Sequence, residues 1–120
     1  MKSDRDKRLL KSLKTLQRVT QVHIDDLSQK MANLETRKEV FKKELAAIEH
    51  ALVFEESVAL TNIENRTTIG AFYLKFDAKI KDLKGKISRI DMAIDVLREE
   101  IIGHIAEKKK YEKAGEKVGR

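Results

Sequence analysis

The side chains that could carry chemistry in this chain are three histidines, many carboxylates and one Gly-Lys dipeptide followed by a serine. His23, His50 and His104 include no pair at the i, i+4 spacing that places two imidazoles on one helical face, so we expect no metal site. The stretch LKGKIS at residues 83–88 is similar to part of the phosphate-binding loop, but that loop has a glycine where Ile80 stands and follows a β-strand. We therefore expect neither a metal nor a nucleotide.

The carboxylates predict no catalytic centre. Two carboxylates become an acid and a base only where a concave, partly dry pocket drives their pKa values apart, and a pair of long helices offers no such pocket. The chain has no cysteine, which excludes disulfides and thiolate metal ligands. We therefore expect a protein that is not an enzyme and that has no cofactor.

The composition favours long helices. Charged residues make up 38% of the 120 residues, aromatic residues make up 5%, and there is no proline. A hydrophobic content of 41% is too high for a disordered polyelectrolyte, so these side chains must be buried along some surface. The N-terminus, MKSDRDKRLLKSLK, and the rest of the chain contain no apolar stretch of signal-peptide or membrane-spanning length. We expect a soluble, cytoplasmic protein that is peripheral to a membrane at most.

The first 69 residues contain no glycine and carry a seven-residue repeat of apolar side chains. We call positions a and d of this repeat the seam, with Leu10 at position a. Ten of its thirteen positions in this half are apolar, which predicts one long helix with a single packing face. The positions are Leu10, Leu13, Gln17, Thr20, Ile24, Leu27, Met31, Leu34, Lys38, Phe41, Leu45, Ile48 and Leu52.

The second half repeats this pattern. Eleven of thirteen seam positions are apolar, and the strict seven-residue spacing predicts a left-handed supercoil. The positions are Ile69, Tyr73, Phe76, Ile80, Leu83, Ile87, Ile90, Ile94, Leu97, Ile101, His104, Lys108 and Tyr111.

Between the two repeats lies ALTNIENRTTIG, a polar segment rich in threonine and asparagine. We predict a helix over about 3–60, a turn over about 61–68 and a second helix over about 69–116, together one coiled-coil domain over residues 1–120. Asn62 or Asn65 would end the first helix in the left-handed conformation, and Thr67 or Thr68 would cap the second.

An antiparallel hairpin predicts that facing residues have numbers adding to about 128. This register places Leu34 opposite Ile94, and it leaves Lys38 opposite Ile90 with its amine reaching water. The polar seam layers, such as Thr20 opposite Lys108, then gather at one end. The predicted fold class is all-α, with two long helices forming an antiparallel left-handed coiled-coil hairpin. A parallel dimer of extended chains is the alternative, because isoleucine at a with leucine at d suits two parallel strands. We favour the monomeric hairpin.

The charge of the chain is concentrated at its two ends. Residues 1–18 carry a net +5 and residues 104–120 a net +3, against +6 for the whole chain, so the remainder is −2. In the hairpin the two ends form one basic tip. A solvated end that keeps the chain soluble is one interpretation. An acidic protein partner is the second, since the charge would steer its association. A nucleic acid fits less well because the tip is mostly lysine with Tyr111 as its one aromatic residue.

A second candidate surface follows the turn, in IGAFYLKF at residues 69–76. Tyr73 and Phe76 are seam residues and are expected to be mostly core. Phe72 flanks the seam, where it either packs over the turn or anchors another protein.

These features together resemble the flagellar export protein FliJ family and its counterparts in type III secretion. The likeness covers the full length: two heptad helices, a polar turn, no cysteine or proline, and EKKKYEK, in which Lys109, Lys110, Tyr111 and Glu112 are similar to a Lys-Lys-Tyr-Glu sequence of some members. The resemblance implies a stalk or adaptor of the export apparatus, with its helix ends in the hexameric export ATPase and further contacts to the export gate and export chaperones.

Carried onto this chain, the resemblance implies that the basic tip binds the ATPase and that Phe72 and Tyr73 contact the gate. The tip residues are Arg5, Lys7, Arg8, Lys11, Lys109, Lys110 and Lys113. Two other functions stay open. A generic coiled-coil scaffold needs only the seam, and a nucleic-acid-binding helical arm would use the same basic tip.

Overall fold

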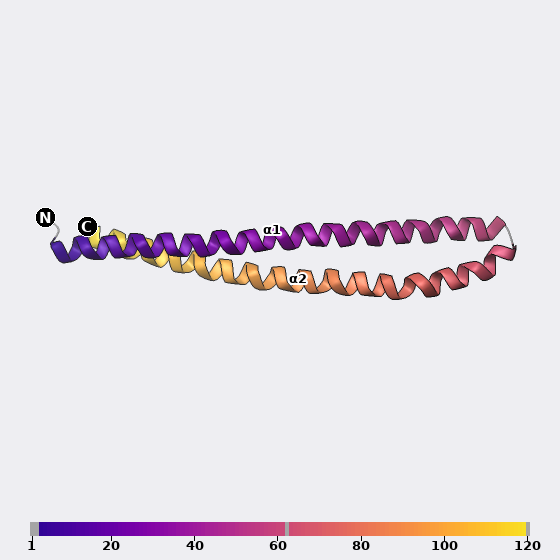
Figure 1. Cartoon of the computed structure of the whole chain (residues 1–120). Coiled ribbons are helices and arrows are strands. Elements are labelled where there is room, and N and C mark those ends of the chain that lie inside the picture. The colour runs from indigo at the N-terminus through magenta and orange to yellow at the C-terminus, as the bar shows by residue number, and fades with distance from the viewer. Residues whose placement is uncertain (1–2, 62, 120) are drawn as a thin grey trace. The chain divides into compact units, whose positions relative to one another are not determined.

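The computed structural model describes the backbone of residues 3–61 and 63–119, and the side chains of residues 3–58, 70–71 and 73–119. The described chain forms two helices, α1 (Asp4–Thr61) and α2 (Ile63–Gly119) (Figure 1). The predicted fold class, an all-α antiparallel coiled-coil hairpin, is confirmed.

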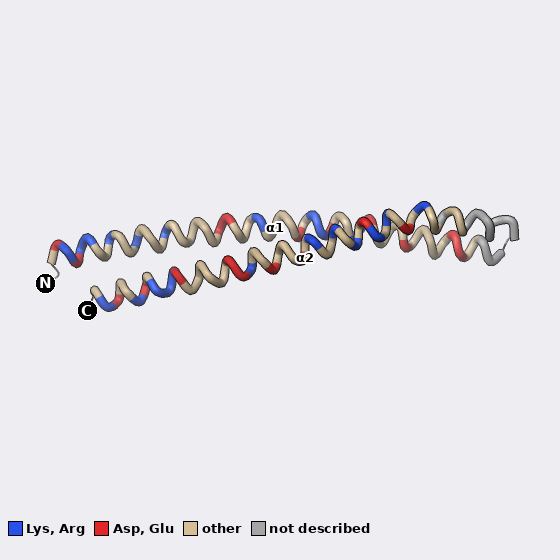
Figure 2. Tube along the Cα trace, turned by 90° about the horizontal axis from the view of Figure 1, so that it is seen from below, with Lys and Arg blue, Asp and Glu red and all other residues tan. Residues whose placement is uncertain are grey.

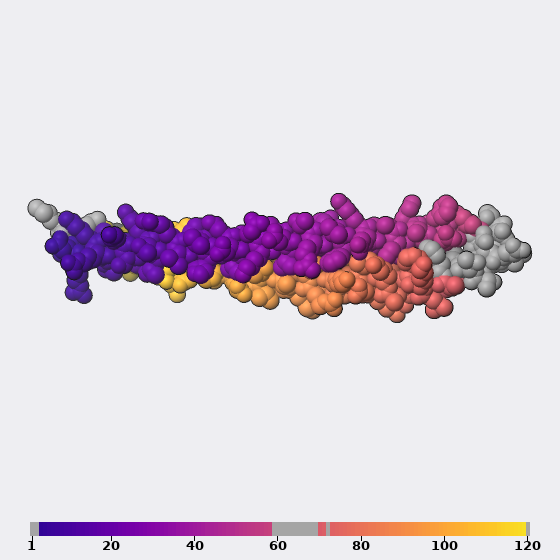
Figure 3. Space-filling view, viewed as in Figure 1, coloured from indigo at the N-terminus to yellow at the C-terminus, as the bar shows by residue number. Residues whose placement is uncertain are grey.

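Contacts divide the chain into two compact units. Unit 1 is Met1–Asn33 with Ile94–Arg120, and unit 2 is Leu34–Ala93. Each unit pairs one stretch of α1 with one stretch of α2, and the space-filling view shows the side chains of the two helices in contact (Figure 3). The single domain over residues 1–120 stays a prediction.

Helix α1 begins where its sequence supplies a cap. The Ser3 hydroxyl accepts a hydrogen bond from the Asp6 backbone N–H at 3.1 Å, and the Ser3 carbonyl accepts one from Lys7 N–H at 3.1 Å. Asp4 and Asp6 place negative charge in the first turn, which the helix dipole favours. The helix therefore begins within one residue of the prediction.

The predicted turn over 61–68 is wrong in extent. Thr61 ends α1 and residues 63–68 belong to the first turns of α2, so Asn65 does not end a helix and Thr67 and Thr68 do not cap one. Asn62 lies outside the described residues. The segment contains neither glycine nor proline before Gly70, so its polar residues cost the helix only a few tenths of a kcal/mol each. At its other end α2 runs to Gly119, three residues beyond the prediction.

The buried residues are all seam residues. Among the described side chains, those less than about a tenth exposed are Leu13, Thr20, Leu27, Leu52, Leu83, Ile90 and Ile94. Leu83 in unit 2 is 1% exposed, and the neighbouring seam positions are mostly half-buried. Because two helices can cover only this narrow stripe, most other positions face solvent.

Side-chain contacts confirm the predicted register in each unit. In unit 1 the rings of His23 and His104 stack with centroids 5.4 Å apart, and in unit 2 the Lys86 ammonium lies 5.4 Å from the Phe41 ring centroid. The residue numbers of each pair add to 127, close to the expected 128. The one buried polar seam residue of the described chain is Thr20, whose hydroxyl donates to the Leu16 carbonyl at 2.8 Å and so leaves no unpaired group.

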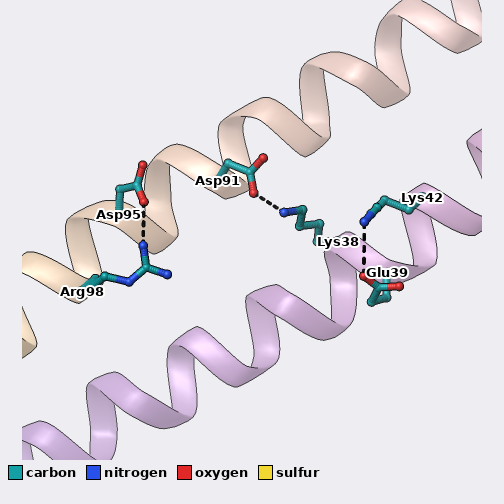
Figure 4. Close-up of polar contacts among 6 residues, drawn as sticks. All are labelled: Lys38, Glu39, Lys42, Asp91, Asp95 and Arg98. Atoms are coloured by element: carbon teal, nitrogen blue, oxygen red, sulfur yellow. Dashed lines mark hydrogen bonds and ion pairs between the residues drawn. The ribbon is translucent and has the colours of Figure 1, made fainter.

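The seam lysine of unit 2 reaches an acid on the other helix. Lys38 Nζ lies 2.6 Å from Asp91 Oδ1, and this hydrogen-bonded carboxylate raises the pKa of Lys38 (Figure 4). The sequence predicted that this amine would reach water, but it lies against Asp91 instead. The cause is that Asp91 follows Ile90 at the edge of the seam.

Candidate partner-binding surface

The predicted basic-tip residues all lie in unit 1, on the first turns of α1 and the last turns of α2, which together we call the basic end (Figure 2). All seven are exposed, and none forms an ion pair within the described part of the chain. The two helix ends are neighbours, since a Cβ added to Gly115 would lie 4.0 Å from Leu10 Cδ2. Exposed lysine and arginine side chains without an ion-pair partner in the protein can bind an acidic ligand.

A hollow in unit 1 sharpens this surface, and its cations were not among the predicted site residues. The hollow has a volume of about 330 Å³ and no carboxylate in its lining. Its lining consists of Lys14, Gln17, Arg18, Gln21 and Lys108. Three cations and two amides surround a space that an anionic group can enter.

Lys108 is the cation that α2 contributes to this hollow. It is a half-buried seam residue, and its Nζ donates to Gln21 Oε1 at 2.9 Å. The Gln21 amide in turn donates from Nε2 to Asp25 Oδ1 at 2.9 Å. Asp25 is therefore the acid of this hydrogen-bond network, and Gln21 separates it from the Lys108 ammonium. A neutral amide orients the ammonium without neutralising it. Lys14 and Arg18, one turn apart on α1, add two charges beside it.

An adjoining hollow of about 430 Å³ shares Lys14 and Gln17 with the first. Leu10 and Leu13 contribute an apolar part of its lining, and Gly115 contributes no side chain to fill it. Glu112 and Glu116 line it from α2. The charged side chains of the first hollow are therefore all positive, whereas those of the second have both signs. A partner segment in this groove would meet cations at one end and an apolar surface at the other.

A hydrogen-bonded cluster of three side chains lies on α2 in unit 1. Tyr111 donates its hydroxyl to Glu107 Oε1 at 2.8 Å, and His104 Nδ1 lies 3.3 Å from Glu107 Oε2. Both contacts lower the pKa of Glu107, and the hydrogen bond from Tyr111 has the larger effect. The same carboxylate raises the pKa of Tyr111. The one aromatic residue of the basic end is therefore engaged inside the unit.

His23 and His104 are brought together in unit 1 by the pairing of the helices. No group of three or more histidine, cysteine or acidic side chains is arranged to hold a metal among the described residues. The rings are instead stacked nearly parallel, at 10°.

The predicted gate-contact residues lie in unit 2. Tyr73 is 37% exposed, which corrects the expectation that this seam position is mostly core. The register places Glu55, a polar residue at the next seam position after Leu52, opposite Tyr73, so no apolar side chain closes over the ring. Tyr73 lines a hollow with Leu52 and Leu74, and Leu74 is 81% exposed. The side chain of Phe72 lies outside the described residues.

No helix in the described ranges is long and apolar enough to cross a membrane. Comparison of the chain with protein-family models, curated proteins and solved structures finds no match. The resemblance to the flagellar export family therefore stays a prediction.

Proposed function

We propose that this protein is a non-enzymatic stalk or adaptor of a type III protein export apparatus, acting in the cytoplasm during flagellum biogenesis. Its basic end, formed by the exposed cations of unit 1, binds the centre of the hexameric export ATPase. Through unit 2 the protein contacts the export gate, with Phe72 and Tyr73 at that contact, and it also binds export chaperones.

The observation that carries the proposal is the unpaired charge around Lys108. Lysine at a seam position costs coiled-coil stability, and a carboxylate neighbour would recover part of that cost. Here the neighbour is Gln21, and Lys14 and Arg18 add like charge to the same hollow. This arrangement does little for the fold of the isolated chain but provides electrostatic complementarity to an acidic protein surface.

The test is a pull-down of the export ATPase with a triple variant of the basic end. Lys109→Glu, Lys110→Glu and Lys113→Glu together should abolish association, because each change replaces attraction by repulsion. The matched control is Lys43→Glu, Lys79→Glu and Lys84→Glu, three exposed lysines of unit 2 with the same change in net charge. The control should bind like the native protein, and both variants should keep their helical circular dichroism. Unchanged binding of the first variant would refute the proposal.

A nucleic-acid-binding arm is the second candidate, because three cations around one hollow also suit phosphate groups. Such an arm would use the same residues but would bind single-stranded or duplex probes with an affinity that falls steeply with salt. Fluorescence anisotropy at low and physiological salt separates the two functions. Tight, salt-dependent binding of nucleic acid by a protein that ignores the ATPase would favour the arm. A generic scaffold would bind neither.

A further inference from the structure

Unit 2 contains a hollow of its own, with a volume of about 390 Å³, beside the middle of the seam. Its floor is apolar and is made by Leu34 and Phe41 of α1 and by Ile90 and Ala93 of α2. Ala93 leaves the space open because its side chain is a single methyl group. A floor of this kind accepts an apolar side chain from a partner.

Cations from both helices form the rim of this hollow: Arg37 on α1, and Lys86 and Arg89 on α2. Lys86 is already engaged. Its Nζ lies 3.1 Å from Asp82 Oδ2 and 5.4 Å from the Phe41 ring centroid. The lysine therefore covers one side of the aromatic ring, and the charge available to a partner is that of the two arginines.

Arg37 and Arg89 are exposed, and neither forms an ion pair or a side-chain hydrogen bond with the described residues. The sequence accounts for this. The positions three and four residues away from each arginine hold no acid, whereas Lys81 has Asp77 four residues away and pairs with it at 2.9 Å. Two guanidinium groups, one from each helix, therefore line this hollow with unused donors.

The position of the Arg89 guanidinium has a local cause. A Cβ added to Gly85 would lie 3.6 Å from Arg89 Nη1, so the guanidinium extends back over the glycine, one turn towards the start of α2. The planar fork of an arginine binds a carboxylate with two parallel hydrogen bonds, which a lysine cannot do.

We propose that this hollow of unit 2 binds an acidic peptide segment of a partner protein, with one apolar side chain on the floor and flanking carboxylates on Arg37 and Arg89. The lining contains no carboxylate that would repel such a segment. A nucleic acid has no apolar side chain for the floor. An anionic bilayer fits less well because Asp82 stands beside Lys86 and would face the headgroups. This surface is separate from the basic end of unit 1, and its existence does not depend on the partner of that end.

The test is a selection from a phage-displayed library of random peptides against the intact protein. We expect enriched peptides to combine glutamate or aspartate with a leucine or an aromatic residue. Binding of those peptides should fall about thirty-fold or more in the variant Arg37→Gln with Arg89→Gln. The control variant, Lys43→Gln with Lys84→Gln, removes the same charge from exposed positions outside the hollow and should bind normally.

Two further variants separate charge from shape. Arg37→Lys with Arg89→Lys keeps the charge but loses the planar fork, and should bind with intermediate affinity. Ala93→Met keeps both arginines and fills the floor, and should also weaken binding. Thermal melting followed by circular dichroism checks that each variant folds.

Three outcomes would overturn the proposal. One is a selection that enriches no acidic peptide, and another is peptides that bind the arginine variant as well as the native protein. The third is a protein that binds no peptide but binds phosphatidylserine vesicles through Arg37 and Arg89. That result would identify the occupant as a membrane.

Discussion

Two lysines occupy seam positions in this molecule, one in each unit, and their partners differ in charge. In unit 2, Lys38 forms an ion pair with Asp91 at 2.6 Å, whereas in unit 1, Lys108 donates to the neutral Gln21 at 2.9 Å. Each lysine stands at position a of one helix and reaches a position e residue of the other, so the geometry of the two pairs is matched.

The comparison separates what a seam lysine does for the fold from what it can do for a partner. Asp91 neutralises Lys38 locally, and the pair contributes to the attachment of the helices in unit 2. Gln21 only orients Lys108, so its positive charge stays available beside Lys14 and Arg18. One side chain at the edge of the seam thus decides whether the lysine serves the hairpin or the surface.

The largest expected effect concerns the apolar cores of the two units. Leu83→Ala should lower the free energy of unfolding by about 3 kcal/mol, because its side chain is 1% exposed and leaves a cavity in unit 2. Leu13→Ala in unit 1 should cost less, about 2 kcal/mol, because Leu13 borders an open hollow beside Gly115. Urea denaturation at fixed protein concentration measures both. Leu74→Ala, at an 81% exposed position, is the control, and a larger loss for Leu13→Ala would contradict the comparison.

The second prediction exchanges the partners of the two lysines. Gln21→Glu gives Lys108 an acid, as Lys38 has, and should weaken binding of the export ATPase about ten-fold. Asp91→Asn leaves Lys38 with a neutral partner, should lower the pKa of Lys38, and should not change ATPase binding. Calorimetry of binding and NMR titration of the lysine side chains measure these effects. Equal loss of binding in both variants would show that the two lysines are equivalent.

The third prediction concerns one glycine substitution in each unit, neither of which changes the charge. Gly103→Ala in unit 1 and Gly85→Ala in unit 2 should each stabilise the protein by about 0.8–1 kcal/mol, because glycine is a poor helix former. A Cβ at Gly103 meets nothing within 4 Å, and one at Gly85 meets only Arg89 Nη1 at 3.6 Å, an ordinary contact. Thermal unfolding compares the two. A loss of stability for Gly85→Ala would mean that Arg89 cannot move aside.

The smallest effect is expected from pH. Because the pKa of Glu107 is lowered, its contribution to stability is present above its ordinary pKa of 4.5 and is lost as pH falls through the folded pKa. Because the pKa of Tyr111 is raised, its contribution to stability is present below pH about 10 and is lost as pH rises through the folded pKa. Tyr111→Phe should therefore destabilise unit 1 slightly between these limits, and the difference from the native protein should shrink outside them. A difference independent of pH would contradict this account.

The seam, the antiparallel register and the concentration of charge at the helix ends could all be predicted from the sequence. A seven-residue repeat is a local property, and Leu83 or Ile94 must be buried wherever a second such stripe is available. The predicted turn covers too many residues because the polar residues after Ile63 reduce helix stability without preventing a helix, so α2 already includes them. The seam position of Tyr73 alone does not predict its exposure, because that exposure depends on Glu55, the residue that faces Tyr73 on the other helix.

The candidate sites were predicted in part. The charge count located the basic end and its exposed lysines, but it did not single out Lys108, Lys14 and Arg18 as one group. Their grouping depends on side chains from two helices, far apart in sequence, that line one hollow. The sequence did not single out Arg37 or Arg89, since Arg37 stands in a stretch of mixed charge and Arg89 has no charged neighbour along the chain.

The sequence by itself determined that this chain forms two long helices, which stripe each buries and where its positive charge lies, because these follow from spacing along one helix. Only the tertiary structure decided which charges are compensated. Asp91 and Gln21 are both ordinary surface residues in a helical repeat, and their effect depends on which seam residue the other helix brings within hydrogen-bonding distance. The pairing of the helices therefore makes Lys38 part of the fold and leaves Lys108 available to bind.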